Sequence, residues 1–370
     1  MNYKLKDICT RISSGKNKKS EEIKDAGKFP VYGGNGIRGF SDEYNFDGEC
    51  VIVGRQGANC GNVRYFAGKA YMTDHAVVIC TDEKTNTKYL SYLLSGLQLG
   101  RLSGQAAQPG ISVGVLSKQS IDLPSVDYQN KVVRKISLYD DLIANNNKRI
   151  KILEKMAENL YKEWFVRFRF PGYETAEFVD GVPKDWKKMN LFDVASVCYG
   201  YNFSSDLFCD DKSLYPVVRI RDIVNNYTNT FTSEECDEKY IIENNSILVG
   251  MDGIFHTRLW TGGRAFLNQR VVKLNSMIDK LSNYQLYHAV YPQIKFWEQT
   301  ISGTTVAHLG DKHLKKISIF MPDERTLKKA FDIFENLLEQ QYILHKQNQN
   351  LIKQRNYLLP RLMSGNLQVK

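Results

Sequence analysis

Two stretches of this 370-residue chain place mostly apolar residues at steps of three and four, and no other feature constrains the fold as much. In the first stretch the steps alternate between four and three residues without a break. Its positions are Val132, Ile136, Tyr139, Ile143, Asn146, Ile150, Leu153, Ala157, Leu160 and Trp164. Such a heptad seam is typical of a helix that packs along its length against another helix. The seam predicts a helix about 50 Å long at 1.5 Å per residue.

A second seam near the C-terminus repeats the first at the spacing that separates Pro124 from Pro322. Its positions are Ala330, Phe334, Leu337, Gln341, Leu344, Asn348, Leu351, Arg355, Leu358 and Leu362. Because Gln341 and Arg355 interrupt it, we expect this helix to pack more loosely or to face a partner helix. Proline lacks the N–H that an interior helical residue donates, so Pro360 is expected to end the helix near Leu359 and to leave Leu362 outside it.

An asparagine occupies the same place in both seams. If the two helices pair antiparallel about a shared midpoint, Asn146 faces Asn348. A buried pair of this kind costs stability but fixes register and orientation. The alternative is that both side chains face solvent because the register differs.

The segments outside the seams also correspond in order along the chain. Residues 5–7 correspond to 191–193, 30–31 to 216–217, 51–57 to 247–253, 103–104 to 302–303 and 123–124 to 321–322. The spacing between partners drifts by about a dozen residues while their order holds. This pattern indicates a duplicated unit with loop insertions.

Apolar runs at 29–32, 49–53 and 76–80 are typical of buried strands, and residues 87–101 predict a helix. The predicted fold class is therefore α+β, with two duplicated domains joined by two long antiparallel coiled-coil helices. The expected parts are a first block at 1–124, a central long helix at 125–167, a linker at 168–186, a second block at 187–322, and a C-terminal long helix and tail at 323–370.

Charge and composition indicate which kinds of partner and which cellular compartment to expect. The chain carries a net charge of +9, which favours polyanions such as nucleic acid. No apolar run is long enough to span a membrane, and the N-terminus does not resemble a secretion signal. The seven cysteines form no C-x-x-C pair, so we expect reduced thiols in a cytoplasmic protein, with neither disulfides nor a metal site.

The loop after each strand at 51–53 and 247–249 carries side chains that could read bases. The first loop holds Arg55, Gln56 and Asn59, and its counterpart holds Asp252, His256 and Arg258. Arginine is the usual partner of guanine, and glutamine or asparagine of adenine. The alternative is that both loops are surface turns without a ligand.

Further polar and basic residues complete the predicted DNA-binding set. A second pair of loops contributes Gln105 and Gln108 in one block, and Thr304, Thr305 and His308 in the other. Residues 268–270, with Arg270, could contact a ligand or be satisfied within a strand. The remaining members of the set are Lys16, Lys18, Lys19, Arg38, Arg64, Arg219 and Arg221.

Motifs of familiar enzymes are absent from the sequence or lack their context. Residues 34–39 match G-x-G-x-x-G, but the turn-like residues 40–48 follow where a nucleotide site needs a helix. We therefore expect a tight glycine turn at a sheet edge. The sequence has no H-E-x-x-H, no G-x-S-x-G, no Walker A motif and no Pro-Pro pair of an amino-methyltransferase. No catalytic residue is predicted.

Taken together, three stretches in this duplicated frame resemble the DNA-specificity subunit of type I restriction–modification systems. They are residues 30–37 (PVYGGNGI), residues 160–166 (LYKEWFV) followed by 170–172 (FPG), and residues 358–365 (LLPRLMSG). The resemblance implies that each block is a target-recognition domain for one half of a bipartite DNA site, with the two helices as a ruler between half-sites. Half-sites contacted from one face would lie about 34 Å apart, which a rod of about 50 Å suits.

The resemblance also implies a non-catalytic chain used in bacterial defence. Two methyltransferase subunits would dock on the helices, and motor-nuclease subunits would join the complex. S-adenosylmethionine and ATP with Mg would belong to those partners, and no cofactor to this chain. Two rivals are a single-chain enzyme that modifies or cuts DNA through an unrecognised site, and a protein-binding scaffold that does not bind DNA.

Overall fold

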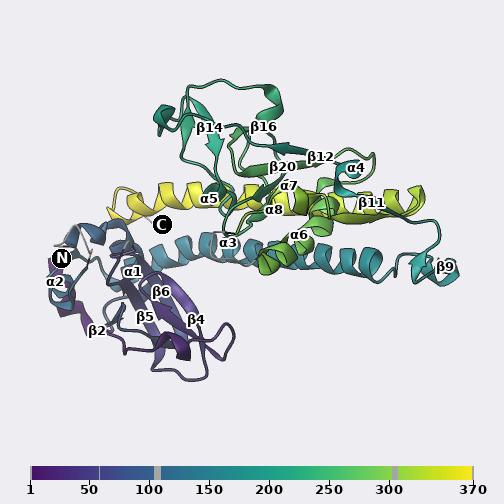
Figure 1. Ribbon diagram of the computed structural model, residues 1–370. Helices are drawn as coiled ribbons and strands as arrows, with labels where there is room; N and C mark the ends of the chain where they lie inside the picture. The colour runs from purple at the N-terminus through teal and green to yellow at the C-terminus, as the bar shows by residue number, and fades with distance from the viewer. Residues whose placement is uncertain (1, 58, 104–109, 302–306, 369–370) are drawn as a thin grey trace. The chain divides into compact units, whose positions relative to one another are not determined.

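The contacts divide the chain into two compact units, which we call unit 1 (residues 1–145 and 347–370) and unit 2 (residues 146–346). The computed structural model describes residues 2–57, 59–103, 110–301 and 307–368. Each unit holds one α+β domain and one half of each long helix, α3 (Val126–Tyr161) and α8 (Glu324–Met363) (Figure 1). This division cuts both helices in the middle, whereas the boundaries drawn from the sequence keep each helix whole.

Unit 1 is built on a six-stranded sheet that is antiparallel except where β3 runs parallel to β6. The strands, in their order across the sheet, are β2 (Cys9–Ser14), β7 (Ala76–Thr81), β5 (Phe46–Gly54), β6 (Val63–Met72), β3 (Phe29–Gly33) and β4 (Gly36–Ser41). The other elements are β1 (Asn2–Lys4) paired with β8 (Ser120–Asp122), α1 (Thr87–Gly96), α2 (Val113–Ser117) and short 3-10 turns. Helix α1 begins where the Asn86 side chain accepts a hydrogen bond from the N–H of Tyr89.

Unit 2 contains a four-stranded sheet and a five-stranded sheet whose strands are shorter. The first sheet has the order β12 (Ala195–Tyr199), β20 (Val271–Ser276), β17 (Ile247–Gly250) and β18 (Thr257–Leu259). The second has the order β13 (Phe208–Cys209), β15 (Phe231–Thr232), β14 (Tyr215–Val218), β19 (Ala265–Leu267) and β16 (Ile241–Ile242). The other elements are β9 (Phe178–Val179) with β10 (Val182–Pro183), β11 (Lys187–Asn190) with β21 (Ser318–Met321), α4 (Leu191–Val194), α5 (Ile220–Ile223), α6 (Asn283–Thr300) and α7 (Asp311–Leu314).

The strand order confirms the predicted duplication. The run β2-β7-β5-β6 in unit 1 has the same sequence of partners as β12-β20-β17-β18 in unit 2. The pair β1–β8 corresponds to β11–β21, and the second strand of each pair lies directly before a long helix. The parallel pair of β3 and β6 corresponds to β14 and β19, because in unit 2 the counterpart of β6 is broken into two short strands.

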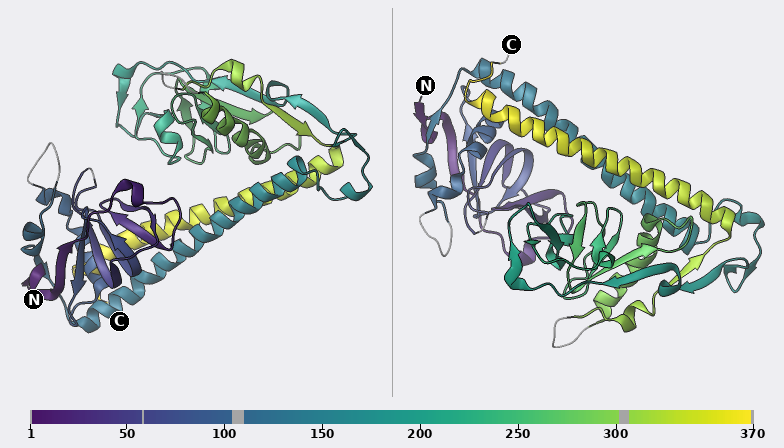
Figure 2. Two further views of the ribbon diagram at one scale, coloured as in Figure 1. Left: turned by 60° about the horizontal axis from the view of Figure 1, so that its bottom comes forward. Right: turned by 90° about the horizontal axis from the view of Figure 1, so that it is seen from above.

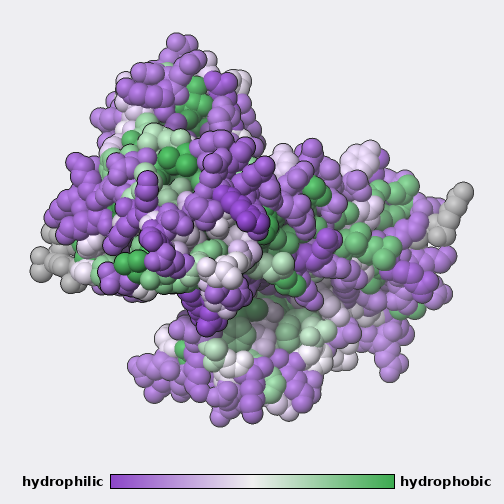
Figure 3. Space-filling view, turned by 90° about the vertical axis from the view of Figure 1, so that its right-hand side faces the viewer, coloured by the Kyte–Doolittle hydropathy of each residue, from purple (hydrophilic) through white to green (hydrophobic). Residues whose placement is uncertain are grey.

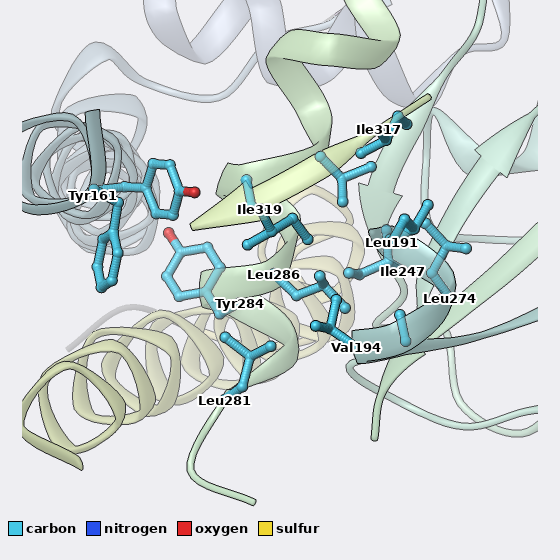
Figure 4. Packing of buried hydrophobic residues seen from close by; sticks show 14 of the residues in the cluster. Tyr161, Leu191, Val194, Ile247, Leu274, Leu281, Tyr284, Leu286, Ile317 and Ile319 are labelled. Atoms are coloured by element: carbon cyan, nitrogen blue, oxygen red, sulfur yellow. The ribbon is translucent and has the colours of Figure 1, made fainter. Parts of the chain in front are cut away.

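Both predicted seams are confirmed by burial, and within each unit the halves of α3 and α8 run antiparallel, side by side (Figure 2). In unit 1, the hydroxyl of Tyr128 near the start of α3 donates to the carbonyl oxygen of Leu362 at the end of α8 (2.9 Å). In unit 2, Ala157 and Leu337 belong to one core. Figure 4 shows Tyr161 of α3 directed toward Tyr284 of α6 within this core.

Gln341 and Arg355, which interrupt the second seam, each have a partner within their own unit. Gln341 is buried and donates to the hydroxyl of Tyr284 (2.8 Å). Arg355 donates to Asp140 of α3 (2.9 Å), and the hydroxyl of Tyr92 donates to the other oxygen of that carboxylate. Burial and the hydrogen bond to Asp140 both raise the pKa of Tyr92. The sequence predicted looser packing or a partner helix at these positions; both side chains are satisfied by hydrogen bonds, and that of Arg355 is to the partner helix α3.

Replacing Arg355 with alanine is expected to lower the free energy of unfolding of unit 1 by about 1–3 kcal/mol, because it leaves Asp140 without its cation. Hydrogen exchange of unit 1 amides measures this loss. Lys353→Ala is the control, since Lys353 is an exposed residue two positions before Arg355 in the same helix. Equal protection in the two variants would show that the ion pair contributes nothing.

The prediction that Pro360 ends the second helix is wrong. Helix α8 continues to Met363, and Leu362 is only 3% exposed within the core of unit 1. The physical reason is that proline removes one backbone hydrogen bond near the helix end, while burying Leu362 contributes about 1.5–3 kcal/mol. The N–H of Ser364 then donates to the carbonyl oxygen of Pro360 (3.0 Å), so the last turn closes.

Candidate nucleic-acid interface

In unit 1, the loops at one end of the six-stranded sheet are tied together by backbone hydrogen bonds. The N–H of Arg55, just after β5, donates to the carbonyl oxygen of His75 (2.9 Å). The carbonyl oxygen of Arg55 accepts from the N–H of Ile111 (2.9 Å), and Gln56 forms a bridge with Gly110. Three segments far apart in the sequence therefore meet at Arg55 and Gln56.

Polar side chains of the predicted set gather at this end of the sheet. A guanidinium nitrogen of Arg55 donates to Ser14 at the end of β2 (3.4 Å). Arg64 at the start of β6 donates to the carbonyl oxygen of Asn35 (3.0 Å), in the turn between β3 and β4. This turn confirms that the glycine motif is a turn leading to the edge strand β4, without a helix after it.

The other basic residues predicted in unit 1 differ in exposure. Lys16, Lys19 and Arg38 are exposed. The side chain of Lys18, in contrast, is only 6% exposed, and its ammonium lies 4.2 Å from the centre of the Tyr71 ring. It also lies within 4 Å of two carboxylates, those of Glu22 and Glu43. This surrounding counts against Lys18 as a phosphate contact, because its charge is already compensated.

Unit 2 repeats the backbone arrangement after β17. The N–H of Met251 donates to the carbonyl oxygen of Arg270 (2.9 Å), and the carbonyl oxygen of Met251 accepts from the N–H of Leu309 (2.7 Å). Asp252 forms a bridge with His308, as Gln56 does with Gly110. The framework is therefore the same in both units, while the side chains on it differ.

In unit 2 the side chains on this framework form a charged cluster. Nδ1 of His308 lies 2.7 Å from one oxygen of Asp252, and Nε of Arg270 lies 3.7 Å from the other. The exposed fraction rises from 32% for Asp252 to 45% for His308 and 57% for Arg270. Residues 268–270 form the turn between β19 and β20, in which Asn268 is buried and Arg270 is exposed.

His256 and Arg258, which the sequence grouped with Asp252, line a groove of about 1330 Å³ within unit 2. Its walls come from α6, β18 and the unit 2 halves of α3 and α8, and they include Lys295 but not Asp252. Burial and the nearby Lys295 lower the pKa of His256. His256 ends the loop after β17, but Arg258 lies within β18, so the prediction that Arg258 belongs to the loop is wrong, and both residues line the basic groove wall.

The two arginines predicted near α5 have different surroundings. Arg219 donates to the hydroxyl of Thr230 (2.5 Å) and stacks 5.4 Å from the centre of the Phe208 ring. Arg221 is exposed, with Nε 3.8 Å from a carboxylate oxygen of Asp222. Burial raises the pKa of Asp222. Arg219 is thus held inside the domain, and Arg221 is the more accessible cation.

Four predicted residues, Gln105, Gln108, Thr304 and Thr305, lie outside the described residues. His75 was not among the predicted residues, and the structure places its carbonyl oxygen against the N–H of Arg55. In unit 2 the corresponding carbonyl oxygen, which accepts from the N–H of Met251, is that of Arg270.

The described residues hold no group of three or more His, Cys, Asp or Glu side chains that could bind a metal ion. Among the described helices, none has the length and apolar character to cross a membrane. The face shown in Figure 3 is mostly hydrophilic, with small hydrophobic groups between the polar ones.

Comparison with known proteins identifies relatives over the whole chain. The EcoprrI specificity subunit of Escherichia coli is 34% identical over 131 residues, which are 35% of this chain and 33% of that protein. A protein named as a type I specificity subunit of Mycoplasma pneumoniae is 26% identical over 367 residues, 95% of this chain and 92% of that protein. The chain therefore spans a third of the first relative's length and nearly all of the second's.

A solved structure has the same fold. The crystal structure of the type I restriction–modification S subunit from M. genitalium superposes with a TM-score of 0.60 at 16% identity, over 98% of this chain and 95% of that one. The relatives are named as specificity subunits, which agrees with the expectation of a non-catalytic chain. A model of the type I restriction modification DNA specificity domain matches residues 1–155 and 183–354, and the chain therefore belongs to the family of type I DNA-specificity subunits.

Proposed function

We propose that this chain reads a bipartite DNA site, with one half-site bound by each unit. The observation that carries the proposal is the repeated loop framework, which keeps its backbone hydrogen bonds in both units but presents Arg55 and Gln56 in one and Met251 and Asp252 in the other. A constant framework with different polar side chains suits two readers of different sequences, because base edges are distinguished by their donor and acceptor pattern.

Affinity would come mostly from phosphate contacts of the exposed basic residues. The chain carries a net charge of +9, and Lys16 and Arg38 in unit 1 and Arg221 in unit 2 are exposed. Contacts of this kind release counterions, so binding weakens as salt rises. A protein scaffold that does not bind DNA would show no salt-dependent binding to duplex DNA.

The partners in this proposal are methyltransferase subunits that dock on the long helices. Within unit 1, α3 exposes Leu138 and Leu142, and within unit 2 it exposes Ile152 and Met156. These residues each precede a seam position by one, so the two in each unit form a short apolar strip beside the seam of that unit. Exposed apolar strips on helices suit a partner helix. The partners would carry S-adenosylmethionine, and the motor-nuclease subunits ATP with Mg, and this chain neither.

The ruler function rests on the helices. Asn146 and Asn348 are both buried, 7% and 6% exposed, which supports a place inside the coiled coil for each of them. Within unit 1, Asp140 of α3 pairs with Arg355 of α8. Asn146 follows Asp140 and Asn348 precedes Arg355 by nearly the same number of residues, so an antiparallel pair in this register suits the predicted pairing of the two asparagines. Whether they pair stays a prediction, and the proposal assigns them the role of fixing register.

Replacing Arg55 with alanine is expected to change the methylated sequence in one half-site only, because Arg55 lies on the framework of unit 1 alone. The measurement is a genome-wide map of methylated adenines in cells that carry the variant and its methyltransferase partner. Arg134→Ala, an exposed arginine of α3 in the same unit, should leave the sequence unchanged. An Arg55→Ala map identical to that of the wild type would refute the assigned role.

A further inference from the structure

The repeated framework defines four equivalent positions in each unit, which we call the crossing positions. In unit 1 they hold Arg55, Gln56, His75 and Gly110, and in unit 2 Met251, Asp252, Arg270 and His308. In both units the first of the four bonds through its N–H to the third, and the second bridges to the fourth. The backbone is kept while all four side chains change.

In unit 2 the carboxylate of Asp252 is shared between two donors. One oxygen faces Nδ1 of His308 at 2.7 Å, and the other faces Nε of Arg270 at 3.7 Å. Asp252 is the least exposed of the three side chains and Arg270 the most. Both oxygens of the carboxylate are therefore engaged, and because Arg270 faces Asp252 through Nε, its two terminal guanidinium nitrogens are the donors that remain for another acceptor.

The backbone at Arg270 is held in an uncommon conformation. Its φ angle is 68°, in the left-handed region that residues other than glycine seldom adopt. The turn is held by the N–H of Met251, which donates to Arg270, and by the N–H of Val271, which donates to Asn268 (3.2 Å). Conformations of this kind persist where the surrounding structure holds them, and they gather at functional sites.

We propose that Asp252 is a positioning residue that, with His308 on its other oxygen, holds Arg270 toward a guanine in the half-site bound by unit 2. This inference rests on the proposed function. The major-groove edge of guanine offers two acceptors, N7 and O6, and matches a pair of donors. Adenine offers one acceptor beside an amino donor there, so the same pair would discriminate against it.

Unit 1 has no counterpart of this cluster at its crossing positions. Gly110 stands where unit 2 has His308, and Gln56 where it has Asp252. The side chains available there are Arg55 and Gln56, which suit a different base pattern. The crossing positions are thus where the specificities of the two units diverge.

The test uses the complete complex of this chain with its methyltransferase partner, expressed in cells, and maps methylated adenines. Arg270→Ala should relax discrimination at one guanine of one half-site by about 10- to 100-fold, the usual worth of a bidentate base contact. Asp252→Asn keeps the size of the side chain but removes the charge that holds both donors. It should relax the same guanine position and leave every other position unchanged.

Two comparisons separate positioning from a merely structural role. The double variant Asp252→Asn with Arg270→Ala should be no more relaxed than Arg270→Ala alone, because Asp252 acts through Arg270. Arg264→Ala is the matched control, since Arg264 is an exposed arginine of the same unit whose Nε lies 3.6 Å from Glu243. It should leave the recognised sequence unchanged.

Three results would overturn the inference. One is unchanged discrimination in both single variants, and another is a relaxed position that is not a guanine. The third is an equal loss of methylation at all sites for Arg270→Ala, which would make Arg270 a phosphate contact. Failure of the proposed function would look different, because the wild-type complex itself would then yield no bipartite methylated site.

Discussion

Replacing Phe334 with alanine is expected to lower the free energy of unfolding of unit 2 by about 3–5 kcal/mol. Phe334 is fully buried at a seam position of α8, with its ring centroid 6.1 Å from that of Tyr284 and 6.0 Å from that of His288. The truncation removes contacts from both the coiled coil and the domain that packs on it. The cavity would also lie beside His288, whose pKa is lowered to about 4 by burial. A water molecule that enters the cavity could therefore form a hydrogen bond with this imidazole.

Tryptophan fluorescence during urea unfolding measures this effect in unit 2 alone. All four tryptophans of the chain, Trp164, Trp186, Trp260 and Trp297, lie between residues 146 and 346. The control is Ile333→Ala, one residue away and 38% exposed, which should cost less than about 1.5 kcal/mol. Similar losses in the two variants would show that the seam residue is not part of a packed core.

Inserting four residues into both long helices is expected to lengthen the spacer between the two half-sites by one or two base pairs, with loss of methylation at the original site. Four residues advance a helix by about 6 Å and turn it about 40° beyond a full turn. One base pair advances DNA by about 3.4 Å and turns it by about 34°. The inserted helical turn and the added base pairs therefore both lengthen the complex and rotate it in the same direction.

The insertions belong at the boundaries between the units, after Asn145 in α3 and after Lys346 in α8, where the internal contacts of each unit are left intact. The control carries the insertion in α3 alone, which shifts one seam against the other and should abolish methylation. The readout is the methylated sequence in cells with the methyltransferase partner. A double insertion that methylates the original site with its original spacer would contradict the ruler.

The long helices and the duplication follow from the sequence because both are periodic. A heptad seam can be recognised from its own repeat, without knowledge of distant contacts. Every predicted position of the two seams, from Val132 to Trp164 and from Ala330 to Leu362, is at least partly buried. The paired loops also followed, since the match of residues 51–57 with 247–253 placed Gln56 and Asp252 at equivalent points. Pro360 shows the limit of a local rule, because the burial of Leu362 by another segment outweighs the cost of the proline.

The site was harder to predict, because its contacts join residues that are distant in the sequence. Asp252 and His308 are 56 residues apart, and nothing local announces that they form a hydrogen bond. Lys18 is basic and lies in a polar segment, yet Tyr71 and Glu43 cover and compensate its charge. Exposure and pairing of charged side chains depend on which strands become neighbours, and single-sequence patterns do not contain that information.

The measurement that tests the account most directly is the map of methylated adenines in cells that express this chain with its methyltransferase partner. The account predicts an asymmetric site in two parts, separated by a spacer of fixed length, that disappears when this chain is deleted. A methylated sequence that is continuous, or that persists without this chain, would contradict the assignment of one half-site to each unit.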